Sequence, residues 1–136
     1  MADEIVTASA VLPGTDTQYI DGFAGVAITA GQTVYLDTST STYKLADADA
    51  SSSTALAKGI AMNDAATAQP VRVAAGGHID PGFTVGVGHV YVVSGTAGGI
   101  APVADLAAGD FTHVVGLGIT ASSLKIVNAT AGVAYV

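Results

Sequence analysis

From residue 31 onward, the chain consists of short apolar segments separated by turn residues. The apolar segments have four to nine residues and are rich in Val, Ile, Thr and Tyr, whereas Gly, Asn, Asp and Ser stand between them. This pattern is typical of β-strands. The predicted strands are TVYLD, YKLA, AKGIAM, VRVAA, VGHVYVV, IAPVA, THVVGLGIT, LKIVN and GVAYV. We therefore predict an all-β fold, a compact β-barrel or β-sandwich of about 8–10 short strands.

The order of these segments repeats once along the chain. We predict one β-domain over residues 31–136, made of two similar halves at about residues 31–80 and 86–136 and related by a pseudo-twofold axis. In this alignment Arg72 and Lys125 take the same strand position, and we expect both to face solvent or the acidic groups of a neighbouring subunit. The matching segments are Val34-Tyr35-Leu36 with Val90-Tyr91-Val92, Leu45-Ala46-Asp47 with Val103-Ala104-Asp105, Ala57 to Ile60 with Gly116 to Ile119, and Val71-Arg72-Val73 with Leu124-Lys125-Ile126.

Residues 1–30 have no sustained period, and Pro13-Gly14 and several glycines interrupt them. Apolar residues nevertheless recur there more often than in a disordered tail. We predict an extended N-terminal arm that becomes ordered on a partner. The alternative is that part of this segment adds an edge strand to its own domain. The candidate partner-interface residues are Ile5, Val6, Val11, Leu12, Tyr19, Ile20 and Phe23.

Composition favours a protein that works within an assembly. The chain has 136 residues, which suits one domain, and 50% of them are hydrophobic but only 6% aromatic. Only 11% are charged, against roughly 25% in an ordinary soluble domain. The alternative is a monomer whose surface is covered by neutral Ser and Thr.

The net charge of −7 leaves only Lys44, Lys58, Arg72 and Lys125 as cations. Four scattered cations cannot neutralise a phosphate backbone, so we expect no nucleic-acid partner and no binding to anionic membranes. The N-terminus has no basic region followed by an apolar stretch, and no run of about 20 apolar residues occurs. Cysteine is absent, which excludes disulfides and thiolate chemistry.

Three histidines and one Asp-rich segment are the candidates for chemistry. His78, His89 and His113 lack the spacing of a metal-binding pair, and each lies near a strand start, so we expect surface or interface side chains. A histidine cluster around a trimer axis is the alternative. The segment DADASSST departs from a calcium loop at Ser52 and Lys58, and we expect a loop there, with one helical turn as the alternative. We predict no catalytic residues, no cofactor and no metal.

Several of these segments resemble proteins encoded among the head genes of tailed bacteriophages. The matching stretches are AITAGQ with VYLD, KLADAD, KGIAMN, QPVRV, VYVVS, GGIAPVAD and VVGLGIT, over roughly residues 23 to 130. The chain resembles the capsid decoration proteins, also called cement or head-fibre-like proteins. The resemblance is a pattern of strands and turns, and it carries no residue roles with it.

The resemblance implies a non-enzymatic structural protein of the virion. It would be made in the bacterial host cytoplasm, sit on the outer capsid surface as a homotrimer, and stabilise the capsid by bridging neighbouring major capsid proteins. Several weak contacts per trimer would suffice, because the attachment is multivalent. The alternative is a receptor- or glycan-binding domain of a phage tail or head fibre, which would need exposed aromatic side chains. Five tyrosines are available for this role, and no tryptophan.

Overall fold

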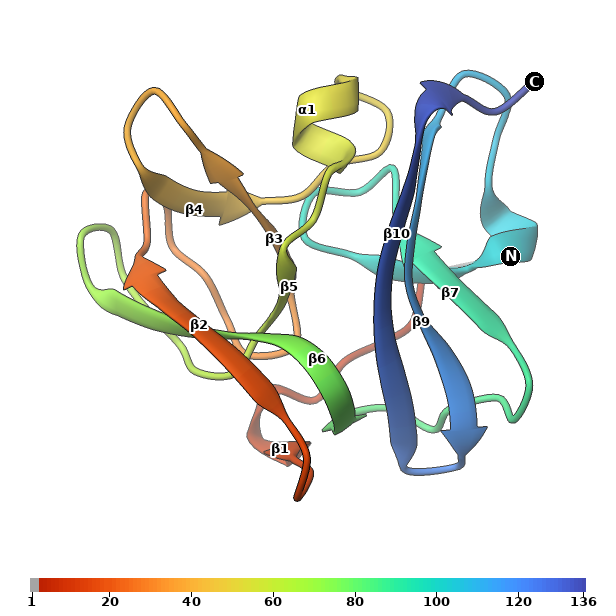
Figure 1. The fold of residues 1–136 in the computed structure, drawn as a ribbon, viewed down its shortest axis with the longest axis horizontal. Helices are drawn as coiled ribbons and strands as arrows, with labels where there is room; N and C mark the ends of the chain where they lie inside the picture. Colours follow the sequence, from red (N-terminus) through yellow and green to blue (C-terminus); the bar gives the residue numbers. More distant parts are fainter. Residues whose placement is uncertain (1–2) are drawn as a thin grey trace.

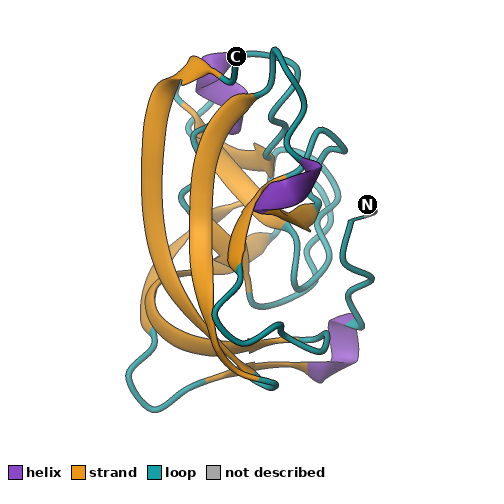
Figure 2. Ribbon diagram, turned by 90° about the vertical axis from the view of Figure 1, so that its right-hand side faces the viewer, coloured by secondary structure: helices purple, strands orange, loops and turns teal. Residues whose placement is uncertain are grey.

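A computed structural model describes residues 3–136 and contains one sheet of ten antiparallel strands that curls into a half-barrel (Figure 1). Strands hold 49% of the residues and helices 7%, so the predicted all-β fold is confirmed. Figure 2 shows the long strands on one side of the molecule and most of the loops on the opposite side. The strands are β1 (Val11–Pro13), β2 (Gln18–Phe23), β3 (Thr33–Asp37), β4 (Thr42–Leu45), β5 (Gly59–Ala61), β6 (Pro70–Pro81), β7 (Val90–Val93), β8 (Ile100–Pro102), β9 (Phe111–Thr120) and β10 (Ser123–Ala134).

The strand order of the sheet has an internal symmetry. It runs β4-β3-β5-β6-β10-β9-β7-β8, so that β6 and β10 meet in the middle and the first four strands mirror the last four. The segments matched in the sequence lie on, or directly after, corresponding strands on the two sides of this junction, although none of the four matches has the residue-by-residue register of the sheet. The junction itself is short and antiparallel, with Ile79 opposite Leu124 and Gly77 opposite Ile126.

The hydrogen-bonded register defines which residues correspond. In the first half, Val34 pairs with both Leu45 and Gly59. In the second half, Tyr91 pairs in the same way with Pro102 and Gly116. The two sets are related by a shift of 57 positions (34 to 91, 59 to 116). On the neighbouring strand, Ala74 opposite Ile60 corresponds to residue 125 opposite residue 117. By this register Lys125 corresponds to Ala74, two positions beyond the Arg72 that the sequence alignment paired with it.

Two hydrophobic cores lie on opposite faces of β5 and β6. Ile60 and Ala74 belong to the larger core, to which β7, β9 and β10 also contribute. Ala61 and Val73, which point the other way, belong to the smaller core of the first half. β5 is therefore buried on both faces, as is β6 at Val73 and Ala74, because the second half packs over the outside of the first.

The segment predicted as an arm contains two strands that pair with β6 of the same chain. β2 pairs with the first part of β6 and β1 with its end. A parallel bridge between Ala24 and Tyr43 then links the end of β2 to β4, so this part of the sheet almost closes. This arrangement agrees with the alternative stated for the N-terminal segment, in which part of it adds an edge strand to its own domain. Residues 1 and 2 of the predicted arm lie outside the described residues.

The Asp-rich segment predicted as a loop contains one short helix, α1 (Ser52–Ala55), as its alternative anticipated. Ser51 caps the helix: its hydroxyl accepts the backbone N–H of Thr54, and the Thr54 side chain accepts the backbone N–H of Ser51. This reciprocal capping satisfies donors that a four-residue helix would otherwise leave unpaired. In Figure 1 the helix lies between the upper ends of the two halves.

Candidate functional site

The seven residues of the predicted N-terminal interface separate into two groups. Three of them support the fold of their own chain: Val11 is buried, Val6 packs against the larger core and Ile20 against the smaller one. The other four present their side chains to solvent and are available to a partner. These are Ile5, Leu12, Tyr19 and Phe23.

The backbone around Ile5 is held on the second half. The N–H of Glu4 donates to the carbonyl of Ile100 and the N–H of Thr7 to the carbonyl of Gly82, both at 2.9 Å. Ile5 lies between these two anchors, and its side chain is 88% exposed. An apolar side chain on a fixed backbone can dock against a partner without a large loss of conformational entropy.

The turn between β1 and β2 is tied to β6 through Asp16 and His78. The Asp16 carboxylate lies 2.7 Å from Nδ1 of His78 and also accepts the His78 backbone N–H at 3.0 Å. The Thr17 hydroxyl donates to the His78 carbonyl at 2.7 Å. The hydrogen bond from the His78 side chain lowers the pKa of Asp16 below its usual value.

The solvent-exposed side of β2 combines aromatic and charged side chains. Arg72 on β6 donates to both carboxylate oxygens of Asp21, with Nε at 2.8 Å, and its guanidinium lies 5.0 Å from the ring centroid of Tyr19. The hydrogen bonds between the two side chains lower the pKa of Asp21 and raise that of Arg72. Phe23 is on the same face, two positions beyond Asp21. The Arg72 side chain is exposed, as the sequence predicted.

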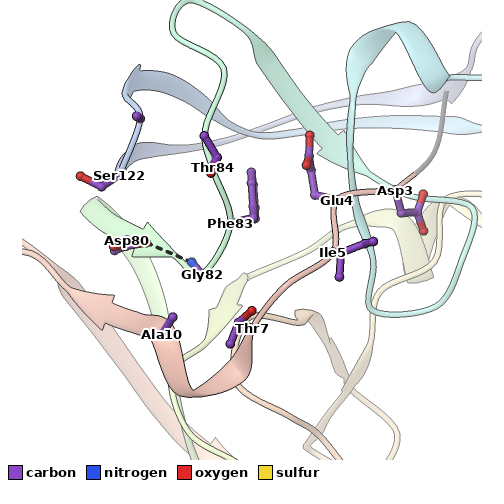
Figure 3. A pocket seen from close by; sticks show the side chains of 11 residues that line it. Asp3, Glu4, Ile5, Thr7, Ala10, Asp80, Gly82, Phe83, Thr84 and Ser122 are labelled. Atoms are coloured by element: carbon purple, nitrogen blue, oxygen red, sulfur yellow. Dashed lines mark hydrogen bonds between the residues drawn. The ribbon is translucent and has the colours of Figure 1, made fainter.

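A groove of about 670 Å³ runs between the N-terminal segment, the end of β6 and the turn that joins β9 to β10 (Figure 3). Phe83 lies in the middle of the side chains that line it, and Ile5 lies at its rim. The charged residues of the lining are all acidic: Asp3, Glu4 and Asp80. One Asp80 oxygen accepts the backbone N–H of Gly82 at 3.1 Å. The groove places exposed Ile5 beside a negatively charged surface.

The three histidines lie in three different environments. His78 pairs with Asp16, and His89 is exposed with its ring 6.4 Å from that of Tyr91. His113 is buried, so the expectation that all three are surface or interface residues is wrong for this one. Its position on β9 faces the seam between β10 and the first half, which the sequence pattern could not reveal because the seam is formed by residues far apart in the chain.

Burial of His113 favours its neutral form over the protonated one. Its Nε2 lies 3.4 Å from the side-chain oxygen of Asn128, whose amide nitrogen donates to the carbonyls of Lys58 and Ala75. The Asn128 oxygen is thus left as the acceptor, which places the imidazole proton on Nε2. Among residues 3–136, Nδ1 is buried without a hydrogen-bond partner. Burial lowers the pKa of His113, and the nearby charge of Lys58 adds to this effect.

The Asp-rich segment folds on itself. An Asp47 oxygen accepts the backbone N–H of Asp49 at 3.2 Å, and the Asp47 carbonyl accepts the Thr54 hydroxyl at 2.9 Å. Burial raises the pKa of Asp47. Within the described part of the chain, no three His, Asp or Glu side chains come close enough together to hold a metal ion.

Four exposed aliphatic side chains on and around β9 are not among the interface residues predicted from the sequence. The signal was present in the segment GLGI of β9, where the glycines take the buried positions and the bulky residues the exposed ones. A pattern of this kind reverses the usual arrangement of a strand. The four residues are Val87, Val103, Leu117 and Ile119.

Comparison with known proteins gives no family for this chain: no protein-family model matches it, and no curated sequence is significantly similar. Among the described residues, no helix is both long and apolar enough to cross a membrane.

Proposed function

We propose that this chain is a non-catalytic structural protein of a tailed-phage particle. It binds the outer surface of the capsid and stabilises it by bridging neighbouring major capsid proteins, to which it attaches as a homotrimer. The observation that supports this proposal best is the set of exposed apolar side chains on the N-terminal segment, Ile5, Leu12, Tyr19 and Phe23. Their backbone is fixed by hydrogen bonds to the rest of the domain.

The proposed attachment depends on burial of apolar surface. Full burial of one large apolar side chain contributes about 1.5–3 kcal/mol. A few such contacts per subunit, repeated within a trimer, hold the protein on the particle through multivalent binding.

The test compares binding of variants to capsids assembled without this protein. We expect the double variant Leu12→Ser, Phe23→Ser to bind at least ~10-fold more weakly in co-sedimentation, because two apolar contacts are lost. Val133→Ser, which removes an equally exposed aliphatic side chain at the far end of β10, is the matched control. Unchanged binding of the double variant, or an equal loss in the control, would contradict the proposal.

Point substitutions are better suited to this test than removal of residues 1–30. Ala24 and Ile28 are buried in the smaller core, and β2 covers one edge of β6. Deletion of the whole segment would therefore unfold the first half, and lost binding could not be assigned to the exposed side chains.

Tyr19 favours a second candidate, a receptor- or glycan-binding domain of a phage fibre. Its exposed ring lies beside the Arg72–Asp21 pair, and such a combination of stacking and charged hydrogen-bonding groups suits a sugar. Tyr43 and Tyr91 are buried and cannot contribute. A glycan array probed with the purified protein distinguishes the candidates: saturable glycan binding that is lost in Tyr19→Ala, together with no capsid binding, favours the fibre domain.

A further inference from the structure

The outer face of the second half is an uncovered aliphatic surface. One row of paired residues crosses it, with Leu117 on β9 between Lys125 on β10 and Val90 on β7. Val103 follows β8 directly and continues the row, since Tyr91 pairs with Pro102. Leu117 is 37% exposed and Val103 43%.

Two more residues extend this surface. Ile119 is two positions beyond Leu117 on the same face of β9 and is 43% exposed. Val87 lies beside them, because the next residue, Gly88, donates its N–H to the carbonyl of Gly118. An apolar hollow of about 410 Å³ adjoins the row at Val90 and Val103. We refer to Val87, Val90, Val103, Leu117, Ile119 and Lys125 as the outer face.

The corresponding surface of the first half is buried within the same chain. By the shift of 57 positions, Leu117 corresponds to Ile60, Val103 to Ala46 and Val90 to Thr33. All three of these first-half residues are almost fully buried. Ile60 and Ala46 lie in the larger core, and the Thr33 backbone and hydroxyl bond to the carbonyls of residues 98 and 99 of the second half.

The face of the first half that corresponds to the outer face is therefore covered, and the second half of the same chain covers it. The four strands around the outer face carry no carboxylates: β7, β8, β9 and β10 contain no Asp or Glu, although the protein carries eleven of them. The carboxylate nearest in sequence is that of Asp105, two positions after Val103. Two copies with a net charge of −7 each repel one another, and the repulsion is smallest where carboxylates are absent.

From the burial of the equivalent face and the absence of carboxylates from β7, β8, β9 and β10, we infer that the outer face of the second half is the surface through which a second copy of this chain binds. Leu117, Ile119, Val90 and Val103 form the apolar centre of the contact, and Lys125 lies at its edge. The inference names the surface for the self-association included in the proposed function, and it does not depend on capsid binding.

The test measures the mass of the full-length protein in solution by light scattering and sedimentation, over a concentration range and without capsids. We expect the wild type to have a multiple of its 13.3 kDa chain mass. Ile119→Lys and Leu117→Lys place a charge in the centre of the contact and should weaken self-association at least ~10-fold. Val133→Lys adds the same charge at an exposed aliphatic position outside the outer face and should leave the mass unchanged.

A far-ultraviolet spectrum and a melting curve establish that each variant is folded. If substitution within β9 prevents folding, Val103→Lys takes its place, because that residue lies just outside the strands. A monomeric wild type overturns the inference, as does a mass that is unchanged in the outer-face variants or reduced equally in Val133→Lys.

Capsid binding is measured separately on the same proteins. A monomeric wild type that binds capsids overturns this inference and leaves capsid attachment standing. An oligomer that Ile119→Lys dissociates supports the inference even if no capsid binding is found, and in that case the proposed capsid role fails. A monomeric wild type whose capsid binding is lost in Ile119→Lys assigns the outer face to the capsid protein and overturns the inference.

Discussion

At the scale of single residues, Asn128 and His113 show how a seam between two sheet regions is sealed. Asn128 has a positive φ of 52°, which asparagine tolerates better than most residues. From this position its amide group satisfies two carbonyls of the first half, and its oxygen faces His113. In this arrangement the imidazole of His113 is buried, and among the described residues Nδ1 has no hydrogen-bond acceptor to which it could donate if it were protonated.

This arrangement predicts a loss of stability in weak acid. The pKa of His113 is lower in the folded protein than the usual histidine value of about 6.5, so its contribution to stability is complete above about pH 6.5. As the pH falls below that value, the unfolded chain takes up the proton first, and the free energy of unfolding decreases. Urea unfolding at pH 7.5 and pH 5 should show a smaller free energy of unfolding at pH 5.

The control is His113→Gln, which has a side chain that does not titrate. We expect the difference between the two pH values to be smaller in this variant than in the wild type. The lowered pKa values of Asp16, Asp21 and Asp37, the last at about 2, affect stability only below about pH 4, outside this range. An equal pH dependence in both proteins would show that His113 is not responsible.

The residues of the N-terminal segment mark the limit of sequence reasoning at this scale. The recurrence of apolar residues showed that the segment is ordered, but the side of each residue depends on pairing with β6, about sixty positions away. Period-two alternation could not assign Val11 to the core and Leu12 to the surface until the pairing of Leu12 with Asp80 was known.

At the scale of elements, the close approach of neighbouring strands depends on glycines at equivalent positions. A side chain at Gly59 would collide with the carbonyl oxygen of Ala74 on β6, and one at Gly116 with that of Lys125 on β10. These contacts correspond under the register shift between the halves. In both places, β5 against β6 and β9 against β10, the two strands lie so close together that no space remains for a Cβ atom at the glycine.

Gly116→Ala should therefore destabilise the protein by about 1–3 kcal/mol, the cost typical of forcing an extra methyl group into a packed region. The clash involves backbone and cannot be relieved by a change of rotamer. Gly95→Ala is the control, because its added methyl group meets only atoms at ordinary contact distance, 3.5 Å or more. The measurement is the free energy of unfolding in urea, and equal values for the two variants would contradict the explanation.

Strand positions were largely predictable because turn residues flank the apolar segments. The segment TVYLD is β3 to the residue. The predicted strand LKIVN and the first three residues of the predicted strand GVAYV belong to the single strand β10. The pairing of β6 was not predictable, because one strand of 12 residues pairs in turn with β2, β5, β10 and β1. Local sequence determines where a strand lies, whereas its partners follow from the packing of distant segments.

At the scale of the whole molecule, the two halves depend on each other. Ile60 and Ala74 of the first half complete the larger core, and the turn containing Gly98 bonds to the backbone of residues 33 and 46. Neither half can expose its shared surface to water without losing this apolar burial. The domain is thus one cooperative unit even though its architecture is repeated.

We therefore expect a single two-state unfolding transition. Tyr19, Tyr35 and Tyr43 lie before the second half, and Tyr91 and Tyr135 lie within it. The double variant Tyr91→Phe, Tyr135→Phe therefore leaves fluorescence from the first part of the chain, and the triple variant Tyr19→Phe, Tyr35→Phe, Tyr43→Phe leaves it from the second half. The urea midpoint followed by fluorescence should coincide with that followed by far-ultraviolet circular dichroism in each variant. Separate transitions in the two halves would contradict this expectation.

The covering of one half by the other has a consequence for how the two sequences can diverge. If the halves arose by duplication of a four-stranded ancestor, the copy that became covered had to keep residues that fit beneath its twin, such as Ala46 and Ala74. The copy that stayed uncovered carries Val103 and Lys125 at the same places. A duplication of this kind would restrict which substitutions the first half tolerates more than it restricts those of the second half.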